Sequence, residues 1–391
     1  MRIAVITKAP FPDGTAPSTY ILNVCRVMER CGHHVTVLGC RRGHMTDHPV
    51  EGVFDGIEYI NFDSVRRGKM LTYLYDNFFE RYAIEMLRRL GNQDIVFLYG
   101  GTVTVASVLK RYCERKNMKF GAFECEWFTK DSFSSQVSQK HITDIVNLIP
   151  YAAKNADVAI LISSYLTKYF LSCNVPSIMI PNIVDLADEK WNVRKSAAAC
   201  DKLKIAYAGI PGVGKDELGT VIKAIELLPE NFKEKVELHV YGPDEEKMKF
   251  YLNLQGVEAV PSNVICHGKQ KQDQIPERLN ECHYTILIRK PGQRANAGFS
   301  TKMVESFAAG IPFIANITGD IATYLKDEEN GIVVADESVE ACRAALIRAW
   351  ELLDKNSEMR VAAYKTAQDN FDYRIYVDAM KDFLSGIRGN E

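Results

Sequence analysis

The sequence lacks the features that mark secreted, disulfide-built or membrane-spanning chains. Its ten cysteines include no C-x-x-C pair and no regular spacing, so we expect scattered buried thiols in a reducing compartment. No apolar run approaches the roughly 18 residues that cross a bilayer. The apolar stretch within residues 1–7 is also too short for a signal peptide. These absences predict a cytoplasmic protein.

Strong charge, repeats and metal-binding motifs are also missing. The 48 Lys and Arg residues nearly balance the 50 Asp and Glu residues, for a net charge of −2. This balance argues against a surface that covers nucleic-acid phosphates. No histidine has metal-ligand spacing with cysteine or carboxylates, and no D-x-D motif occurs. We therefore expect no metal site, no resident cofactor and no nucleic-acid partner.

What is present is the composition of an ordinary globular chain. It has 391 residues, of which 47% are hydrophobic and 25% charged, and this length favours two domains. A pattern of strand, glycine-containing loop and helix starts at residues 3–7 and restarts at 204–209. Further strands alternate with helices after each start, which predicts two doubly wound α/β domains with parallel sheets.

The domain prediction follows from where the pattern restarts. We predict a first domain over 1–190, a second over 191–371 and a closing helix within 372–391, with the polar stretch 185–201 as linker. Ligands are expected at the carboxyl ends of the strands and in a cleft between the domains. The other predicted strands are 34–38, 94–98, 119–123, 158–162, 177–180, 236–241, 264–266, 285–288, 312–315 and 331–334.

The loop after the strand at 204–209 matches seven of the eight positions of a P-loop. Asp216 stands where a P-loop has Ser or Thr to bind Mg²⁺. The sequence leaves open a different phosphate-facing loop or a plain structural turn. In the former, Lys215 can reach a diphosphate.

Residues 289–305 are the most informative stretch. Gly298 lets the backbone approach a ligand closely, and Ser300 is placed to cap a helix that runs to about Ala309. A helix start forms an anion site, and Glu305 lies one turn after Thr301, where it suits a ribose. The alternative is a capped helix with an exposed Glu.

These residues carry a family resemblance. Residues 298–314 resemble the donor-site signature of glycosyltransferase family 4, the retaining GT-B enzymes, and so do Pro181 to Asp185, Tyr207 to Lys215, Asn330-Gly331 and Asp13 to Ala16. The resemblance implies two Rossmann-like domains facing across a cleft, with the C-terminal helix crossing back to the first domain. It assigns donor binding to Gly14, Thr15, Gly209, Lys215, His267, Arg289, Gly298, Phe299, Ser300, Thr301, Lys302 and Glu305.

Two departures from the family pattern bear on the chemistry. The first acid of the family's E-x7-E motif falls on Ala297, and the Arg that often precedes the phosphate-loop Lys is missing. Arg289 or Arg294 can supply the second positive charge. We therefore assign catalytic roles to Lys215, Arg294 and Glu126. A metal-independent route, in which the leaving phosphate accepts the acceptor's proton, fits a sequence with no identifiable nucleophile.

Three further sites have two interpretations each. Glu126 and Trp127, after the strand at 119–123, are acceptor-binding candidates together with Asp13, or else plain loop residues. His267 begins the family's base-contacting loop, or is a hydrogen-bonded structural residue. The basic and aromatic stretch 66–82, followed by Arg88-Arg89, suits a peripheral contact with anionic lipid, or an ordinary helix with its aromatics packed inward.

The sequence thus predicts a hexosyltransferase that uses a nucleoside-diphosphate sugar, UDP-linked by preference. Its predicted acceptor is a glycan or a lipid-linked saccharide, in surface polysaccharide synthesis at the inner face of the membrane. Two alternatives remain open: a sugar-nucleotide epimerase or hydrolase of the same fold, and a nucleotide-binding protein without catalysis.

Overall fold

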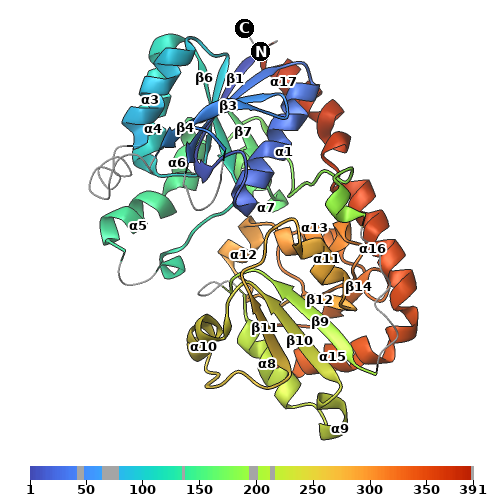
Figure 1. The fold of residues 1–391 in the computed structure, drawn as a ribbon. Coiled ribbons are helices and arrows are strands. Elements are labelled where there is room, and N and C mark those ends of the chain that lie inside the picture. Colours follow the sequence, from blue (N-terminus) through green and yellow to red (C-terminus); the bar gives the residue numbers. More distant parts are fainter. Residues whose placement is uncertain (42–47, 64–78, 134–136, 193–200, 212–215, 389–391) are drawn as a thin grey trace. The chain divides into compact units, whose positions relative to one another are not determined.

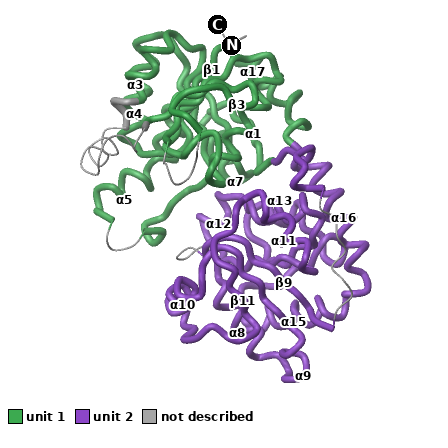
Figure 2. Tube along the Cα trace, viewed as in Figure 1, with its two compact units in different colours: residues 1–183, 373–391 green, residues 184–372 purple. Residues whose placement is uncertain are grey.

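The computed structural model describes residues 1–41, 48–63, 79–133, 137–192, 201–211 and 216–388. They divide into two compact units: residues 1–183 with 373–391, and residues 184–372 (Figure 2). The chain passes between the units at 183–184, whereas the sequence prediction set this boundary at 190–191. The stretch predicted as a linker includes Trp191, which is buried in the core of the second unit.

The first unit is built on an eight-stranded sheet (Figure 1). Its strand order is β3-β4-β2-β1-β5-β6-β7-β8, and every pair is parallel except β3 with β4. The central strands are buried on both faces, which explains their continuous apolar runs. The strands are β1 (Arg2–Pro10), β2 (His34–Arg41), β3 (Glu51–Phe54), β4 (Ile57–Asp63), β5 (Ile95–Tyr99), β6 (Lys119–Glu124), β7 (Val158–Leu161) and β8 (Ser177–Met179).

Helices cover both faces of this sheet. α3, α4 and α6 belong to one layer, and α1 packs with α17 in the other. The last helix therefore returns to the first unit as predicted, and Lys119 Nζ donates to the carbonyl of Ile387 at 2.9 Å. The helices are α1 (Ala16–Arg30), α3 (Phe79–Leu90), α4 (Val103–Lys116), α5 (Gln139–Val146), α6 (Leu148–Asn155), α7 (Ser164–Ser172) and α17 (Val377–Arg388).

The β3–β4 hairpin is absent from the sequence prediction. Residues 51–53 of β3 are exposed, and buried residues alternate with more exposed ones over 57–60 of β4, so neither strand has the continuous apolar run by which the other strands were found. Asp55 and Gly56 form the turn with φ values of 52° and 82°. An Asp-Gly pair is the preferred turn of a two-residue hairpin, so the signal was present in the sequence.

The second unit contains a six-stranded parallel sheet in the order β11-β10-β9-β12-β13-β14. α8 and α15 pack together, and α13 packs against α11 and α16. The strands are β9 (Leu203–Ala208), β10 (Val236–Tyr241), β11 (Val264–Gly268), β12 (Tyr284–Leu287), β13 (Phe313–Asn316) and β14 (Gly331–Val334). The helices are α8 (Leu218–Glu226), α9 (Glu230–Lys233), α10 (Glu245–Asn253), α11 (Ile275–Asn280), α12 (Gln293–Ala297), α13 (Thr301–Ala308), α14 (Ile321–Tyr324), α15 (Val339–Glu351) and α16 (Asn356–Asn370).

The strand order identifies where each sheet is suited to bind a ligand. Successive strands are added toward one edge of the sheet and then toward the other, and this change of direction falls between β1 and β5 in the first unit and between β9 and β12 in the second. Ligands of doubly wound sheets bind at the carboxyl ends of the strands beside this reversal. In the second unit these ends lead into Gly209 and Arg289, two of the predicted site residues. The predicted doubly wound α/β class is confirmed.

Candidate functional site

The start of α13 lies at the centre of the predicted site in the second unit. Ser300 is the N-cap, and its Oγ accepts a hydrogen bond from the Met303 N–H at 3.2 Å. Ser300 also lets the backbone change from an extended to a helical conformation at this point. The positive end of the helix dipole therefore falls beside the loop that carries Gly298 and Phe299. The predicted cap and helix are confirmed.

A buried carboxylate holds two cationic side chains at this helix start. Asp216 Oδ1 accepts from Arg289 Nε at 2.9 Å, and Asp216 Oδ2 accepts from Lys302 Nζ at 2.9 Å. The hydroxyl of Tyr207 also donates to Oδ2, at 2.7 Å. The sequence interpretation assigned Arg289 and Lys302 to the donor and saw Asp216 only as a departure from a P-loop. The structure instead joins all three in one network.

This network remains charged although it is buried. The side chains of Asp216 and Arg289 are 2% and 7% exposed, and that of Lys302 is 19% exposed. Burial acts to raise the pKa of the Asp216 carboxyl, but Lys302 and Arg289 outweigh it and hold this pKa below its usual range. One negative and two positive charges leave a net positive charge next to the helix start, which suits an anion.

Two glycines allow the strand ends to meet at this point. Gly209, after β9, has a φ of +136°, and a Cβ there would lie 2.8 Å from Lys302 Cε. Gly242, after β10, has a φ of +148°, and a Cβ there would lie 2.3 Å from the carbonyl oxygen of Gly209. Both positions therefore require glycine, for its backbone conformation and for space. The Lys302 side chain lies across the first of them.

Glu305 lies one turn into α13 and is half-buried. Burial raises the pKa of its carboxyl, and Lys302 and Lys190 act in the opposite direction. Among the described residues no hydrogen bond or ion pair joins this carboxylate to another side chain. It is therefore available to accept hydrogen bonds from a ligand's hydroxyl groups.

The remaining predicted residues of this stretch have different surroundings. Arg294 lies on α12 and is half-buried, and Ala297, at the end of α12, is fully buried. Phe299 is half-buried, and its ring packs against Tyr324 and Phe371. Lys215, the predicted phosphate-loop lysine, lies outside the described residues.

His267 belongs to an aromatic stack on β10 and β11. Its ring stacks on Tyr241 at 4.5 Å, and its Nε2 lies 3.0 Å from Nδ1 of His239. The register of these strands shifts beside it, between Val240 and Tyr241. The hydrogen bond to His239 agrees with the interpretation of His267 as a structural residue. Because His267 is also exposed, its contact with a nucleotide base stays a prediction.

The residues at this strand end fall within a region that is similar to a known family. Residues 213–367 match the family model of the glycosyl transferases group 1. The match spans β10 to β14, α13 and most of α16, and it includes Arg289, Lys302 and Glu305. No curated protein sequence matches the chain.

Solved structures show how far the similarity of fold extends. Sucrose-phosphate synthase from Thermosynechococcus elongatus is 14% identical over all of both chains, with a TM-score of 0.73. The starch synthase IV catalytic domain from Arabidopsis thaliana, bound to ADP and acarbose, is 12% identical over 99% of both chains, with a TM-score of 0.70. Anabaena HepE in complex with UDP and glucose is 14% identical over 98% of this chain and 99% of its own, with a TM-score of 0.68. The chain has the GT-B fold of glycosyltransferases.

The glycosyl transferases group 1 match does not reach the first unit, where three predicted residues surround the end of β1. Gly14 has a φ of +104°, and the hydroxyl of Thr15 caps α1 by accepting from the Ser18 N–H at 3.3 Å. Asp13 pairs with His48 at 3.3 Å between Oδ2 and Nε2. The glycine loop therefore leads into a capped helix, α1, as the loop with Gly298 leads into α13 in the second unit.

The predicted acceptor residues follow β6 in this unit. Glu126 and Trp127 are half-buried. The Trp127 ring lies 4.7 Å from that of Tyr169 and 6.2 Å from that of Tyr165, both on α7. Trp127 thus joins two tyrosines of the next helix at the carboxyl edge of the sheet. The sequence analysis did not identify these tyrosines.

Glu124, the last residue of β6, is a second acid that the sequence analysis passed over. It is 2% exposed, and no hydrogen bond joins its carboxyl to a side chain in the described part of the chain. Burial raises its pKa well above the ordinary value of 4.5. The sequence did contain a signal for this buried acid, because Glu124 is a single acidic residue at the end of an apolar strand.

This burial predicts a pH-dependent stability. Because the pKa of Glu124 is higher in the folded protein, its contribution to stability is fully present below pH 4.5 and is lost as the pH rises through the folded pKa. We expect Glu124→Gln to melt above the wild type at pH 8, by roughly 2–4 °C per kcal/mol gained. This difference in melting temperature between Glu124→Gln and the wild type should become smaller toward pH 5.

Thermal unfolding at the two pH values tests this expectation. Glu114→Gln, at an exposed position on α4, is the control and should show no such trend. Equal gains for Glu124→Gln at pH 5 and pH 8 would show that the carboxyl does not titrate differently in the folded protein.

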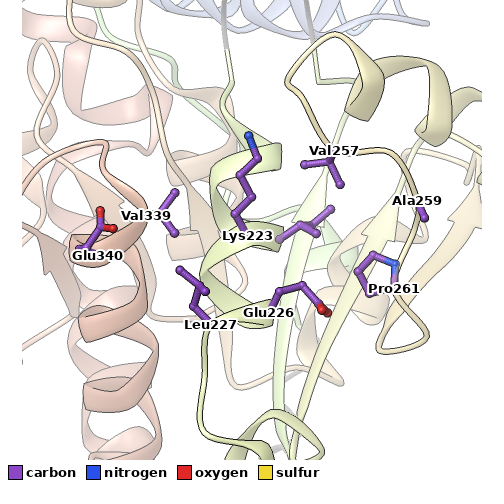
Figure 3. Close-up of a pocket in the computed structure, with 9 residues that line it drawn as sticks. Lys223, Glu226, Leu227, Val257, Ala259, Pro261, Val339 and Glu340 are labelled. Atoms are coloured by element: carbon purple, nitrogen blue, oxygen red, sulfur yellow. The ribbon is translucent and has the colours of Figure 1, made fainter.

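A cavity of about 530 Å³ lies elsewhere in the second unit (Figure 3). Figure 3 shows its labelled lining side chains between α8, the loop at 257–261 and the start of α15. None of the predicted donor residues lines it. The lining residues are Ile222, Lys223, Glu226, Leu227, Val257, Ala259, Pro261, Val339 and Glu340.

Two predictions about metals and membranes concern regions that are only partly described. Within the described ranges, no group of three or more His, Cys, Asp and Glu side chains could hold a metal ion. No helix among the same residues has the length and apolar character needed to cross a bilayer. Most of the stretch predicted to contact lipid, residues 66–78, lies outside the described residues. Of the two arginines that follow it, Arg89 pairs with Glu51 at 2.8 Å.

Proposed function

We propose that the protein is a retaining, metal-independent glycosyltransferase of family 4. In this proposal it moves a hexosyl unit from a nucleoside-diphosphate sugar to a glycan or a lipid-linked saccharide, in surface polysaccharide synthesis. The arrangement at α13 carries the proposal. A capped helix start, a cationic network and a carboxylate one turn later together match the phosphates and the ribose of a nucleotide.

The match of residues 213–367 to the glycosyl transferases group 1 supports a nucleotide-sugar donor. UDP is our preferred nucleotide because HepE, which has the same fold, was solved with UDP and with UDP-glucose. That support is limited to similarity of fold, since the two chains are only 14% identical.

The chemistry required is departure of the diphosphate from the anomeric carbon. Negative charge builds on the β-phosphate as this bond breaks. The dipole of α13 and the ammonium of Lys302 stabilise that charge, and each such donor contributes on the order of a few kcal/mol at the transition state. Glu305 accepts hydrogen bonds from the ribose and orients the donor. The acceptor hydroxyl forms its bond to the anomeric carbon on the face from which the diphosphate leaves, and the leaving phosphate oxygen takes the proton of that hydroxyl. Because attack and departure occur on the same face, the configuration at the anomeric carbon is retained.

A thermal-shift panel with UDP, GDP, ADP, CMP and their sugars tests the donor assignment. Only a ligand that binds the folded protein raises its melting temperature, by an amount that grows with concentration over Kd. We expect UDP and a UDP-hexose to give the largest shifts. No shift with any nucleotide would contradict the proposal.

Incubation with the best nucleotide sugar separates the proposed transferase from its alternatives. Sugar transferred only when a saccharide acceptor is added supports the proposal. Isomerised or released sugar without acceptor would indicate an epimerase or hydrolase instead. Binding without turnover toward any acceptor would indicate a non-catalytic nucleotide-binding protein. Location in the cytoplasm, at the inner face of the membrane, remains a prediction.

A further inference from the structure

Asp216 is the residue of the second unit whose role the proposed function leaves open. Its side chain is 2% exposed, yet it lies at the carboxyl edge of the sheet, in the loop between β9 and α8. A buried carboxylate with two cationic partners is costly to desolvate and gives no clear gain in stability over apolar packing. Its position next to the start of α13 suggests a role in ligand binding.

The two cationic partners of Asp216 differ in what they present to solvent. Arg289 is 7% exposed, and its backbone N–H and carbonyl are both held by the side chain of Asn316, at 2.9 and 2.7 Å. Lys302 is 19% exposed and is the second residue of α13. Arg289 therefore anchors the carboxylate, while Lys302 is the partner that a ligand can reach.

The Lys302 ammonium is fixed on several sides. Its Nζ lies 2.9 Å from Asp216 Oδ2 and 5.0 Å from the centre of the Tyr207 ring. It also lies 3.0 Å from the place that a Cβ on Gly209 would take. An ammonium has three N–H donors, and Asp216 takes one of them. An ammonium can therefore donate to a phosphate oxygen while its bond to Asp216 stays intact.

We propose that Asp216 is a positioning residue that holds the Lys302 ammonium where it meets the diphosphate of the donor. The inference rests on the proposed function for the identity of that ligand. A lysine side chain has four rotatable bonds, and ordering it on binding costs affinity. Asp216 orders it beforehand, and Tyr207 fixes Asp216 through the hydrogen bond at 2.7 Å.

A double-mutant cycle on the full chain tests this role, with inorganic pyrophosphate as the probe and calorimetry as the measurement. Pyrophosphate lacks base, ribose and sugar, so it reports on the phosphate site alone. We expect Asp216→Asn and Lys302→Met each to weaken its binding about tenfold. The double variant should bind no more weakly than Lys302→Met, because Asp216 acts through Lys302.

Asp244→Asn is the matched control. Asp244 also pairs with a lysine of this unit, Lys247 at 2.7 Å, but it is exposed and caps α10. We expect its binding of pyrophosphate to equal that of the wild type.

Three results would overturn the inference. Tighter binding by Asp216→Asn would mean that the carboxylate only reduces the positive charge of the site. Unchanged binding with a lower melting temperature would mean a purely structural role. Additive effects of the two substitutions would mean that Asp216 does not act through Lys302.

Tyr207→Phe keeps the test decisive if Asp216→Asn does not fold. It removes one hydrogen bond to Asp216 and leaves every charge in place. We expect a two- to threefold loss of pyrophosphate affinity that disappears in the Lys302→Met background. A loss of the same size in both backgrounds would contradict the inference.

Turnover decides the proposed function separately. A wild type that binds pyrophosphate and shows the coupling, yet transfers no sugar, would refute the transferase and leave the role of Asp216 intact. A wild type that turns over a nucleotide sugar without the coupling would refute only the role of Asp216. A wild type that does not bind pyrophosphate would also overturn that role.

Discussion

Replacing Glu305 by Gln is expected to weaken UDP binding by about 10- to 100-fold. Hydrogen bonds to a charged group contribute about 1.5–3 kcal/mol, and the Glu305 carboxylate is placed one turn after the phosphate site to accept two from a ribose. The substitution keeps the size and helix propensity of the residue, so the fold should be unaffected. Calorimetry with UDP measures the effect.

Pyrophosphate gives this prediction a control within the same variant. It has no ribose, so Glu305→Gln should bind it about as well as the wild type does. Glu358→Gln, at an exposed position on α16, controls for the loss of one carboxylate from the unit. Unchanged UDP affinity in Glu305→Gln would remove the ribose contact from the proposed site. Equal weakening toward both ligands would indicate a role in shaping the phosphate site instead.

Replacing Gly242 by Ala is expected to be the most disruptive single substitution at the site. The new Cβ would lie 2.3 Å from the Gly209 carbonyl oxygen, which is backbone and cannot rotate away. The strained φ of +148° adds to this clash. We expect a loss of about 3 kcal/mol or more in the free energy of unfolding, and loss of nucleotide binding because the Gly209 loop must move.

Gly268→Ala is the matched control for this clash. Gly268 is the last residue of the neighbouring strand β11 and also has a positive φ, +67°, but a Cβ there would meet no atom within 4 Å. Gly268→Ala should lower the free energy of unfolding only by the strain of a positive φ at a residue with a Cβ, about 1–2 kcal/mol. Thermal unfolding of both variants measures the difference. If they melt at the same temperature, the close approach of Gly242 to Gly209 does not constrain the site.

Much of the fold could be predicted because its signals are local. Each of the twelve predicted strands overlaps an observed one, since buried parallel strands read as short apolar runs. The cap at Ser300 and the helix after it also followed from adjacent residues. The prediction failed at β3 and β4, which carry no continuous apolar run, although the Asp55-Gly56 turn between them was visible.

The candidate site was only partly predictable. Glu305 and the start of α13 were found from spacing along one helix. Asp216 was interpreted only as a failed P-loop position, and Glu124 was passed over. Burial decides the character of both acids, and one sequence does not show which side chains become buried. Lys215 lies outside the described residues, so its role stays a prediction.

The sequence by itself determined where most strands end and where α13 begins. These properties depend on residues that are neighbours in the chain. Only the tertiary structure decided that Asp216 pairs with Arg289 and Lys302, which lie 73 and 86 residues away. Adjacent parallel strands bring their carboxyl ends to one edge of the sheet, so residues far apart in sequence share one buried network there.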